Sequence, residues 1–292
     1  MSDRYAVIGH PIAHSKSPQI HSAFARATGQ DLEYERLLAP LDGFGSTLAS
    51  FAARGGRGCN VTLPFKEQAF AAASTHAGRA AVAGAVNTLI REGGRWHGDN
   101  TDGPGLVRDI VANLGVPMTG ARLLMLGAGG AARGVLALLL AERPERLVVA
   151  NRTLDRATAL ADAFASHGRL EARSPDRLEG AFDIVINATS AGLAGELPRV
   201  SGAMFAPQAL AYDMMYGDSE TAFLRWAREH GAARGADGLG MLIEQAAESF
   251  YLWRGVRPAT APVLALLRGG SEDNFPLAAT GPPAGENCPP TP

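Results

Sequence analysis

The chain has 292 residues, enough for two domains that each bury a hydrophobic core. Hydrophobic residues make up 46% of it, charged residues 19%, and the formal net charge is −2, so the composition is that of a globular protein and a nucleic-acid partner is not expected. The longest apolar run, 134–141, is far shorter than the ~20 residues of a membrane span, and the first residues lack a secretion signal, so we expect a cytoplasmic protein with no membrane segment.

The first hundred residues alternate between strand-like apolar runs and helical spacing. Ser17 and Pro18 resemble a helix N-cap followed by a first-turn proline, which predicts a helix to about Ala27. Glu92-Gly93-Gly94 predicts a hairpin turn. The expected strands are 5–9, 32–37, 58–63, 85–90 and 95–98, and the other expected helices are 41–53, one that starts at 65, and 102–114.

A glycine- and proline-containing stretch, 115–120, separates this part from a second α/β unit. The alternation there implies a parallel, doubly wound sheet, followed by two apolar helices. From Gly270 the chain contains six prolines and little that could form a core, so we expect a disordered tail. The expected strands are 122–126, 147–150, 182–187 and 210–213, and the helices are 131–141, 157–165, 239–253 and 261–267.

A glycine-rich loop between a strand and a helix predicts a dinucleotide site. The sequence Gly127-Ala128-Gly129-Gly130-Ala131-Ala132 fits the G-x-G-x-x-A fingerprint. The first glycine permits a tight turn, the second lets backbone N–H groups approach a pyrophosphate, and Ala132 allows close packing of the helix. The alternative is a glycine-rich turn without a ligand.

The end of the next strand distinguishes the two nicotinamide cofactors. An NAD site commonly has an acidic residue there, whereas a 2′-phosphate calls for arginine. Asn151, Arg152 and Thr153 occupy this place and Arg156 follows one helical turn later, which favours NADP. The alternative is that both arginines are solvated residues at a helix start.

Lys66 is the strongest candidate for proton transfer. Of 27 basic residues, only Lys16 and Lys66 are lysines, and arginine cannot release a proton at usable pH. A lysine beside a carboxylate can protonate the oxygen of a carbonyl that accepts a hydride. We expect Asp102 to orient Lys66. The alternatives are a surface lysine and a simple N-cap role for Asp102.

Polar segments at other predicted strand-to-helix junctions suggest a substrate site. Together with the fingerprint, these segments make the chain resemble the shikimate dehydrogenase family from Tyr5 to about Leu267. The resemblance implies a substrate domain formed by 1–103 and 239–269 and a Rossmann-like NADP domain formed by 104–238. The segments that carry it are Ile8 to Pro18, Asn60 to Lys66, Gly84 to Thr88, Gly98 to Gly103, Gly127 to Ala132, Asn151 to Thr153, Asn187 to Ser190, Tyr212 to Tyr216 and Asp237 to Met241.

The resemblance also implies reversible reduction of 3-dehydroshikimate to shikimate by NADPH, with Lys66 and Asp102 as the catalytic pair. It implies that the helix containing Gln245 packs back onto the first domain. The substrate contacts would be Ser15, Ser17, Thr62, Asn87, Tyr216 and Gln245, and the cofactor contacts Gly127, Ala128, Gly129, Gly130, Ala131, Asn151, Arg152, Thr153, Arg156, Met214 and Gly238.

Two features depart from the family pattern. Gly78 stands where the family often has an acidic residue, and the proline-rich tail lies outside the pattern.

The alternative functions are those of a quinate/shikimate dehydrogenase that uses NAD and of a cofactor-sensing module without turnover. The sequence leaves a homodimer open. We expect no metal site, because Pro11 keeps His10 and His14 off a shared helix face.

Overall fold

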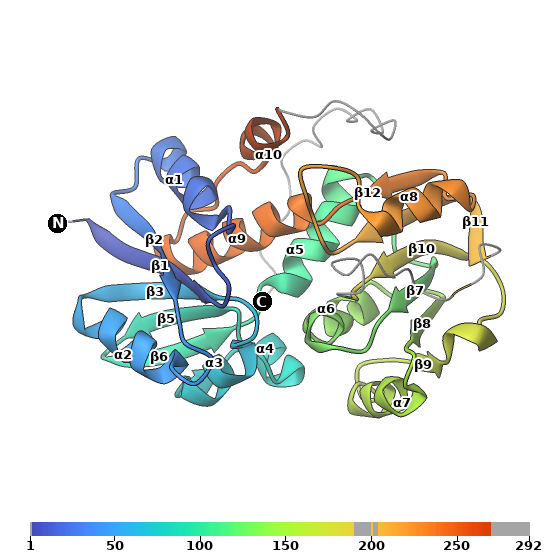
Figure 1. The fold of residues 1–292 in the computed structure, drawn as a ribbon, viewed down its shortest axis with the longest axis horizontal. Helices are drawn as coiled ribbons and strands as arrows, with labels where there is room; N and C mark the ends of the chain where they lie inside the picture. The colour runs from blue at the N-terminus through green and yellow to red at the C-terminus, as the bar shows by residue number, and fades with distance from the viewer. Residues whose placement is uncertain (1, 190–199, 201–203, 270–292) are drawn as a thin grey trace, which may run out of the picture.

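The computed structural model describes residues 2–189, 200 and 204–269, and within these ranges it contains two six-stranded sheets, one from each half of the chain (Figure 1). The first sheet has the order β2-β1-β3-β5-β6-β4, in which β1 pairs in parallel with β2 and β3 while β5 is antiparallel to β3 and β6. The hairpin predicted at Glu92-Gly93-Gly94 joins β5 to β6. These strands are β1 (Asp3–Gly9), β2 (Leu32–Leu38), β3 (Gly56–Val61), β4 (Thr75–His76), β5 (Thr88–Glu92) and β6 (Arg95–Asp99).

The helices of this half are α1 (Ser17–Thr28), α2 (Phe44–Ala53), α3 (Lys66–Ala72) and α4 (Gly78–Ala83). The predicted N-cap of α1 was wrong by one residue, because Lys16 takes the cap position and Ser17 is already helical. The backbone N–H of Ser17 is bound instead by the hydroxyl of Ser15, at 3.3 Å. Leu89 of β5 and the neighbouring Phe51 and Phe65 are fully buried in one hydrophobic cluster.

The second sheet is entirely parallel and has the order β12-β11-β10-β7-β8-β9, which confirms the predicted doubly wound fold. The strands β7, β8 and β10 are apolar runs buried on both faces, as a parallel sheet covered by helices requires. Its elements are β7 (Arg122–Leu126), α6 (Gly130–Ala141), β8 (Arg146–Ala150), α7 (Leu154–Ala163), β9 (Leu170–Arg173), η2 (Pro175–Arg177), β10 (Phe182–Asn187), β11 (Phe205–Asp213), α8 (Ala222–Glu229) and β12 (Arg234–Ala236).

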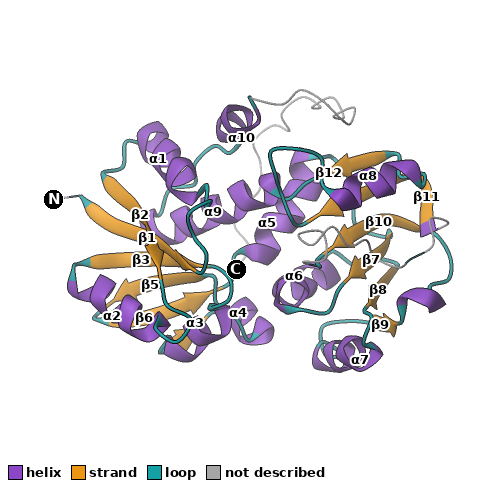
Figure 2. Cartoon of the chain, in the orientation of Figure 1, coloured by secondary structure: helices purple, strands orange, loops and turns teal. Residues whose placement is uncertain are grey.

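Two helices lie between the sheets: α5 (Asp102–Arg108) and α9 (Leu239–Arg254) (Figure 2). The helix predicted over 102–114 is not uniform, because α5 continues as a π-helical turn, η1 (Asp109–Asn113), in which the buried carboxylate of Asp109 accepts a 2.7 Å hydrogen bond from the Tyr212 hydroxyl. The helix α9 packs back onto the first sheet, where the indole of Trp253 donates to the Leu89 carbonyl at 3.1 Å. The short α10 (Ala261–Arg268) follows.

In the described part of the chain, no helix is both long and apolar enough to cross a membrane. The tail predicted from Gly270 lies outside the described residues.

Candidate active site

A cavity of about 520 Å³ lies where the two halves of the chain face each other. Loops after β1 and β3 contribute to it from the first sheet, the start of α6 from the second, and α9 from the end of the chain. All eight residues that the sequence assigned to catalysis or substrate line this cavity: Ser15, Ser17, Thr62, Lys66, Asn87, Asp102, Tyr216 and Gln245.

Lys66 and Asp102 form an ion pair at the cavity wall. Lys66 is the first residue of α3 and Asp102 the first of α5, and the Lys66 Nζ donates to the Asp102 Oδ2 at 2.6 Å. The two side chains are only 23% and 10% exposed. Thr101, not Asp102, takes the N-cap position of α5, so the alternative reading of Asp102 as a simple N-cap was wrong. Its carboxylate is free to hold the lysine.

Asn87 fixes the second oxygen of Asp102. Its Nδ2 donates to the Asp102 Oδ1 at 2.8 Å and to the Thr101 hydroxyl at 3.0 Å. Its Oδ1 accepts from the Thr101 N–H at 2.8 Å and from the Thr88 hydroxyl at 2.9 Å, which defines the orientation of the amide. The sequence placed Asn87 inside a strand, but β5 begins one residue later, at Thr88.

A buried polar layer supports Asn87 from behind. The Ser249 hydroxyl lies 2.8 Å from the Thr88 hydroxyl and accepts from the Asn60 amide at 2.9 Å. The sequence did not single out Ser249, although it lies four residues after Gln245 and therefore on the same face of α9. Its position relative to Gln245 was the one signal in the sequence that could have pointed to it.

The two predicted carboxylate-binding serines lie together at the start of α1. The Ser15 hydroxyl donates to the Ser17 hydroxyl at 3.1 Å. The Arg36 guanidinium donates to the Ser15 carbonyl, with its Nε at 2.9 Å, and so fixes this loop. The sequence missed Arg36, because its partner lies on another element.

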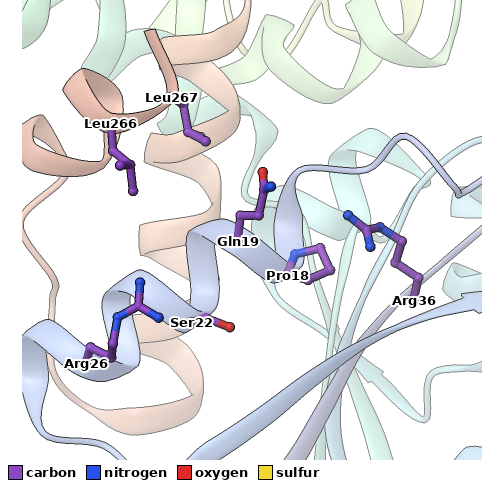
Figure 3. Close-up of a pocket in the computed structure, with 7 residues that line it drawn as sticks. All are labelled: Pro18, Gln19, Ser22, Arg26, Arg36, Leu266 and Leu267. Atoms are coloured by element: carbon purple, nitrogen blue, oxygen red, sulfur yellow. The ribbon is translucent and has the colours of Figure 1, made fainter. Parts of the chain in front are cut away.

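Arg36 also borders a second, open hollow of about 550 Å³ between α1 and α10 (Figure 3). None of the predicted site residues lines this hollow, although Pro18 and Gln19 directly follow Ser17 on α1. Its lining residues are Pro18, Gln19, Ser22, Arg26, Arg36, Leu266 and Leu267.

The loop after β11 brings Met214 and Tyr216 to the cavity. The buried Asp213 holds this loop, because its carboxylate accepts from the Met215 N–H at 3.1 Å and from the Thr221 hydroxyl at 2.6 Å. Burial raises the pKa of Tyr216 above its ordinary value of 10, which is already far above neutral, so the hydroxyl is protonated and able to donate near neutral pH.

The glycine-rich loop has the geometry that a pyrophosphate requires. Gly127 has a φ of 100°, and a Cβ there would lie 2.9 Å from the Thr189 Cγ2. A Cβ on Gly129 or Gly130 would meet no described atom within 4 Å, so the space before the N-terminus of α6 is open to a ligand. The residues present therefore fit a dinucleotide.

The predicted cofactor residues fall into two groups. The residues that line the cavity are Gly129, Gly130, Ala131, Met214 and Gly238. Those that do not line it are Gly127, Ala128, Asn151, Arg152, Thr153 and Arg156. Ala188 and Thr189, which also line it, were not singled out for the cofactor.

Asn151, Arg152 and Thr153 directly follow the C-terminal end of β8, and Arg156 lies in the first turn of α7. The Asn151 amide donates to the Thr153 carbonyl at 2.8 Å, which shapes the turn into α7. Arg152 and Arg156 are exposed, and neither forms an ion pair with another described residue. Both guanidinium groups are therefore available to an anion.

At position 78, the first residue of α4, an added Cβ would meet no described atom within 4 Å. The first side-chain atom of the residue that the family often has there would thus meet open space.

The fold and the cavity define the class of the protein: a two-unit α/β dehydrogenase with a dinucleotide-binding sheet on one side and a substrate-side sheet on the other. Family models described as the shikimate dehydrogenase substrate binding domain, shikimate / quinate 5-dehydrogenase and the shikimate 5'-dehydrogenase C-terminal domain match residues 7–89, 109–195 and 238–268. The chain belongs to the shikimate dehydrogenase family.

Individual relatives agree over nearly the whole chain. The shikimate dehydrogenase (NADP(+)) of Alkalilimnicola ehrlichii is 60% identical over 92% of this chain and 99% of its own. An Ael1 enzyme from Pseudomonas putida has a TM-score of 0.86 and 49% identity, over 91% of this chain and 98% of its own. The shikimate 5-dehydrogenase of Thermus thermophilus, in complex with NADP(H) and shikimate, has a TM-score of 0.79 and 34% identity, over 92% of this chain and 100% of its own.

Proposed function

We propose that this protein catalyses the NADPH-dependent, reversible reduction of 3-dehydroshikimate to shikimate, a step of aromatic amino-acid biosynthesis. The relatives named shikimate dehydrogenase (NADP(+)) support this activity. The observation that carries it here is the 2.6 Å contact between Lys66 and Asp102 in a cavity that the start of α6 also lines. Proton-transfer groups and the dinucleotide end of the Rossmann sheet thus share one space.

The proposed substrate site places hydroxyl and amide groups around a hydroxylated acid. Ser15 and Ser17 would bind the carboxylate. The other ring substituents would be held by Thr62, Asn87, Tyr216 and Gln245, whose side chains come from four different elements or loops. The cofactor would be held by Gly127 to Ala131, the turn from Asn151 to Arg156, Met214 and Gly238.

When bound, NADPH supplies the hydride that reduces the substrate carbonyl carbon. As that carbon is reduced, the Lys66 ammonium donates a proton to the carbonyl oxygen, which becomes the product hydroxyl. Asp102 pairs with the lysine ammonium and orients it through its Oδ2, while Asn87 fixes its Oδ1. In the oxidative direction, neutral Lys66 accepts the hydroxyl proton.

Two alternatives make different predictions. A quinate/shikimate dehydrogenase would also oxidise quinate and often prefers NAD, whereas the exposed Arg152 favours the 2′-phosphate of NADP. A sensing module would bind ligands without turnover, and it would not need a proton-transfer pair. Steady-state oxidation of shikimate and of quinate, each with NADP and with NAD, distinguishes all three. Turnover confined to quinate with NAD, or no turnover at all, would contradict the proposal.

We further propose that residues 1–103 and 239–269 form the substrate domain and residues 104–238 the NADP domain. We expect the enzyme to work in the cytoplasm on small molecules. The formal net charge of −2 gives no overall basic bias that would favour nucleic acid. Assembly as a homodimer is a prediction that analytical ultracentrifugation tests.

A further inference from the structure

A mostly buried ion pair lies directly behind the loop that carries Asp102. Arg79, in the first turn of α4, donates its Nε to the Asp99 Oδ1 at 2.7 Å and its Nη2 to the Asp99 Oδ2 at 2.8 Å. The Asp99 side chain is 7% exposed and that of Arg79 25%. Such a two-bond fork fixes the plane of the carboxylate as well as its position.

Short hydrogen bonds lead from this carboxylate to Asp102. The Asp99 Oδ1 also accepts from the Asn100 N–H at 2.6 Å, and the Asn100 Oδ1 accepts from the Asp102 N–H at 3.1 Å. The Asn100 amide is itself held by the Ala85 carbonyl, at 3.0 Å. The main chain on both sides of Asn100 is thus set by the orientation of Asp99.

Arg79 also connects this loop to α9. Its Nη2 donates to the Glu248 Oε1 at 3.1 Å. Glu248 lies three residues after Gln245 and has a second cationic partner, Arg257. One guanidinium therefore joins α4, the end of β6 and α9, although neither Arg79 nor Asp99 lines the cavity.

We propose that Arg79 and Asp99 are positioning residues that set the distance between Asp102 and Lys66. This inference rests on the proposed catalytic role of Asp102. The guanidinium fork holds Asp99, Asp99 holds the backbone before Asp102, and Asn87 holds the Asp102 side chain from the other side. Displacement of a catalytic group by about 1 Å can cost roughly 100-fold in rate, so a loosened fork acts on turnover more than on binding.

The test compares Arg79→Gln and Arg79→Lys with Arg257→Gln, which removes the other partner of Glu248 and leaves Asp99 untouched. For Arg79→Gln we expect kcat to fall roughly 10- to 100-fold while the KM for shikimate changes by less than about threefold. The pH profile of kcat should shift as well. Arg79→Lys keeps the charge without the fork and should lie in between, and Arg257→Gln should keep the kcat of the unmodified enzyme.

Thermal unfolding and circular dichroism identify the variants that are folded. A folded Arg79→Gln protein with unchanged kcat and pH profile would overturn the inference. If that variant does not fold, the same result for Arg79→Lys would overturn it. Asp102→Asn is measured in parallel: if it retains turnover, the proposed catalytic pair itself is wrong, whereas lost turnover there with unchanged Arg79 variants refutes the positioning role alone.

Discussion

The Lys66 Nζ lies 2.6 Å from the Asp102 Oδ2, although the two residues are 36 positions apart in the chain. The contact joins the first residue of α3 to the first residue of α5. The helix α5 lies between the two sheets, whereas α3 lies in the first half of the chain (Figure 1). The ion pair lines the same cavity as Gly129, Gly130 and Ala131 at the start of α6.

Replacement of Lys66 tests the proton-transfer role. Lys66→Ala should lower kcat roughly 100- to 10,000-fold while NADP affinity stays close to that of the unmodified enzyme, because the lysine lies on the substrate side of the cavity. Lys66→Arg should be nearly as inactive, since a guanidinium keeps the charge but does not release its proton. Steady-state kinetics and fluorescence titration of the cofactor give both quantities. Arg95→Ala, which removes an exposed cation of the same half away from the cavity, is the control.

Replacement of the arginines after β8 tests the cofactor preference. Arg152→Ala should raise the KM for NADP roughly 10- to 100-fold and leave the KM for NAD almost unchanged, because only NADP offers a phosphate for a charge-assisted bond. Arg156→Ala should act in the same direction. Arg177→Ala, another exposed arginine of this half, is the control. Equal losses with both cofactors would refute a contact with the 2′-phosphate.

His21 should make the folded state sensitive to acid. Its ring is fully buried, stacks on Tyr34 with centroids 4.2 Å apart, and neither nitrogen has a described hydrogen-bond partner. Burial lowers its pKa from 6.5 to about 3, because the charged ring is disfavoured there. The unfolded chain thus binds a proton below pH 6.5 that the folded chain does not bind until about pH 3, so stability falls on acidification through this window.

Within that window, His21 should lower the free energy of unfolding by about 1.4 kcal/mol for each pH unit of acidification. His21→Phe preserves an aromatic ring against Tyr34 and should reduce the slope of unfolding free energy against pH by this amount. Urea unfolding at several pH values between these limits measures it. His167→Phe, the same change at an exposed histidine, should leave the slope nearly unaltered. An identical slope in both variants would contradict a buried neutral ring.

Gly134 allows α6 to pack directly against the carboxylate of Asp102. A Cβ at this position would lie 3.3 Å from the Asp102 Oδ2 and 3.4 Å from the Asn100 Nδ2. Since Lys66 and Asn87 already hold Asp102, Gly134→Ala should lower kcat by about threefold to tenfold, although alanine favours a helix. Gly45→Ala in α2 meets open space and should leave kcat unchanged. An unchanged kcat in Gly134→Ala would contradict this prediction, because it would show that the Asp102 carboxylate can shift away from the added methyl group without loss of activity.

Local patterns in the sequence were sufficient for most of the second half. The apolar runs 122–126 and 182–187 are strands with the predicted bounds, because strands buried on both faces need continuous apolar residues. The sequence did not predict five short elements, because their few residues carry little periodicity. These are β4 and α4 in the first half of the chain and β9, α8 and β12 in the second. The π-helical turn after α5 was also missed, and its buried Asp109 finds its partner Tyr212 on a distant strand.

The sequence by itself determined the strand-helix alternation, the glycine-rich loop, the arginine-bearing turn after β8 and the unusual lysine at position 66, because each depends on neighbours in the chain. Tertiary structure decided which groups meet: Asn87 and Lys66 on opposite oxygens of Asp102, Arg36 on the Ser15 carbonyl, and Arg79 on Asp99. Those contacts join residues from separate elements, and their geometry is set by how the sheets and α9 pack, which no local spacing encodes.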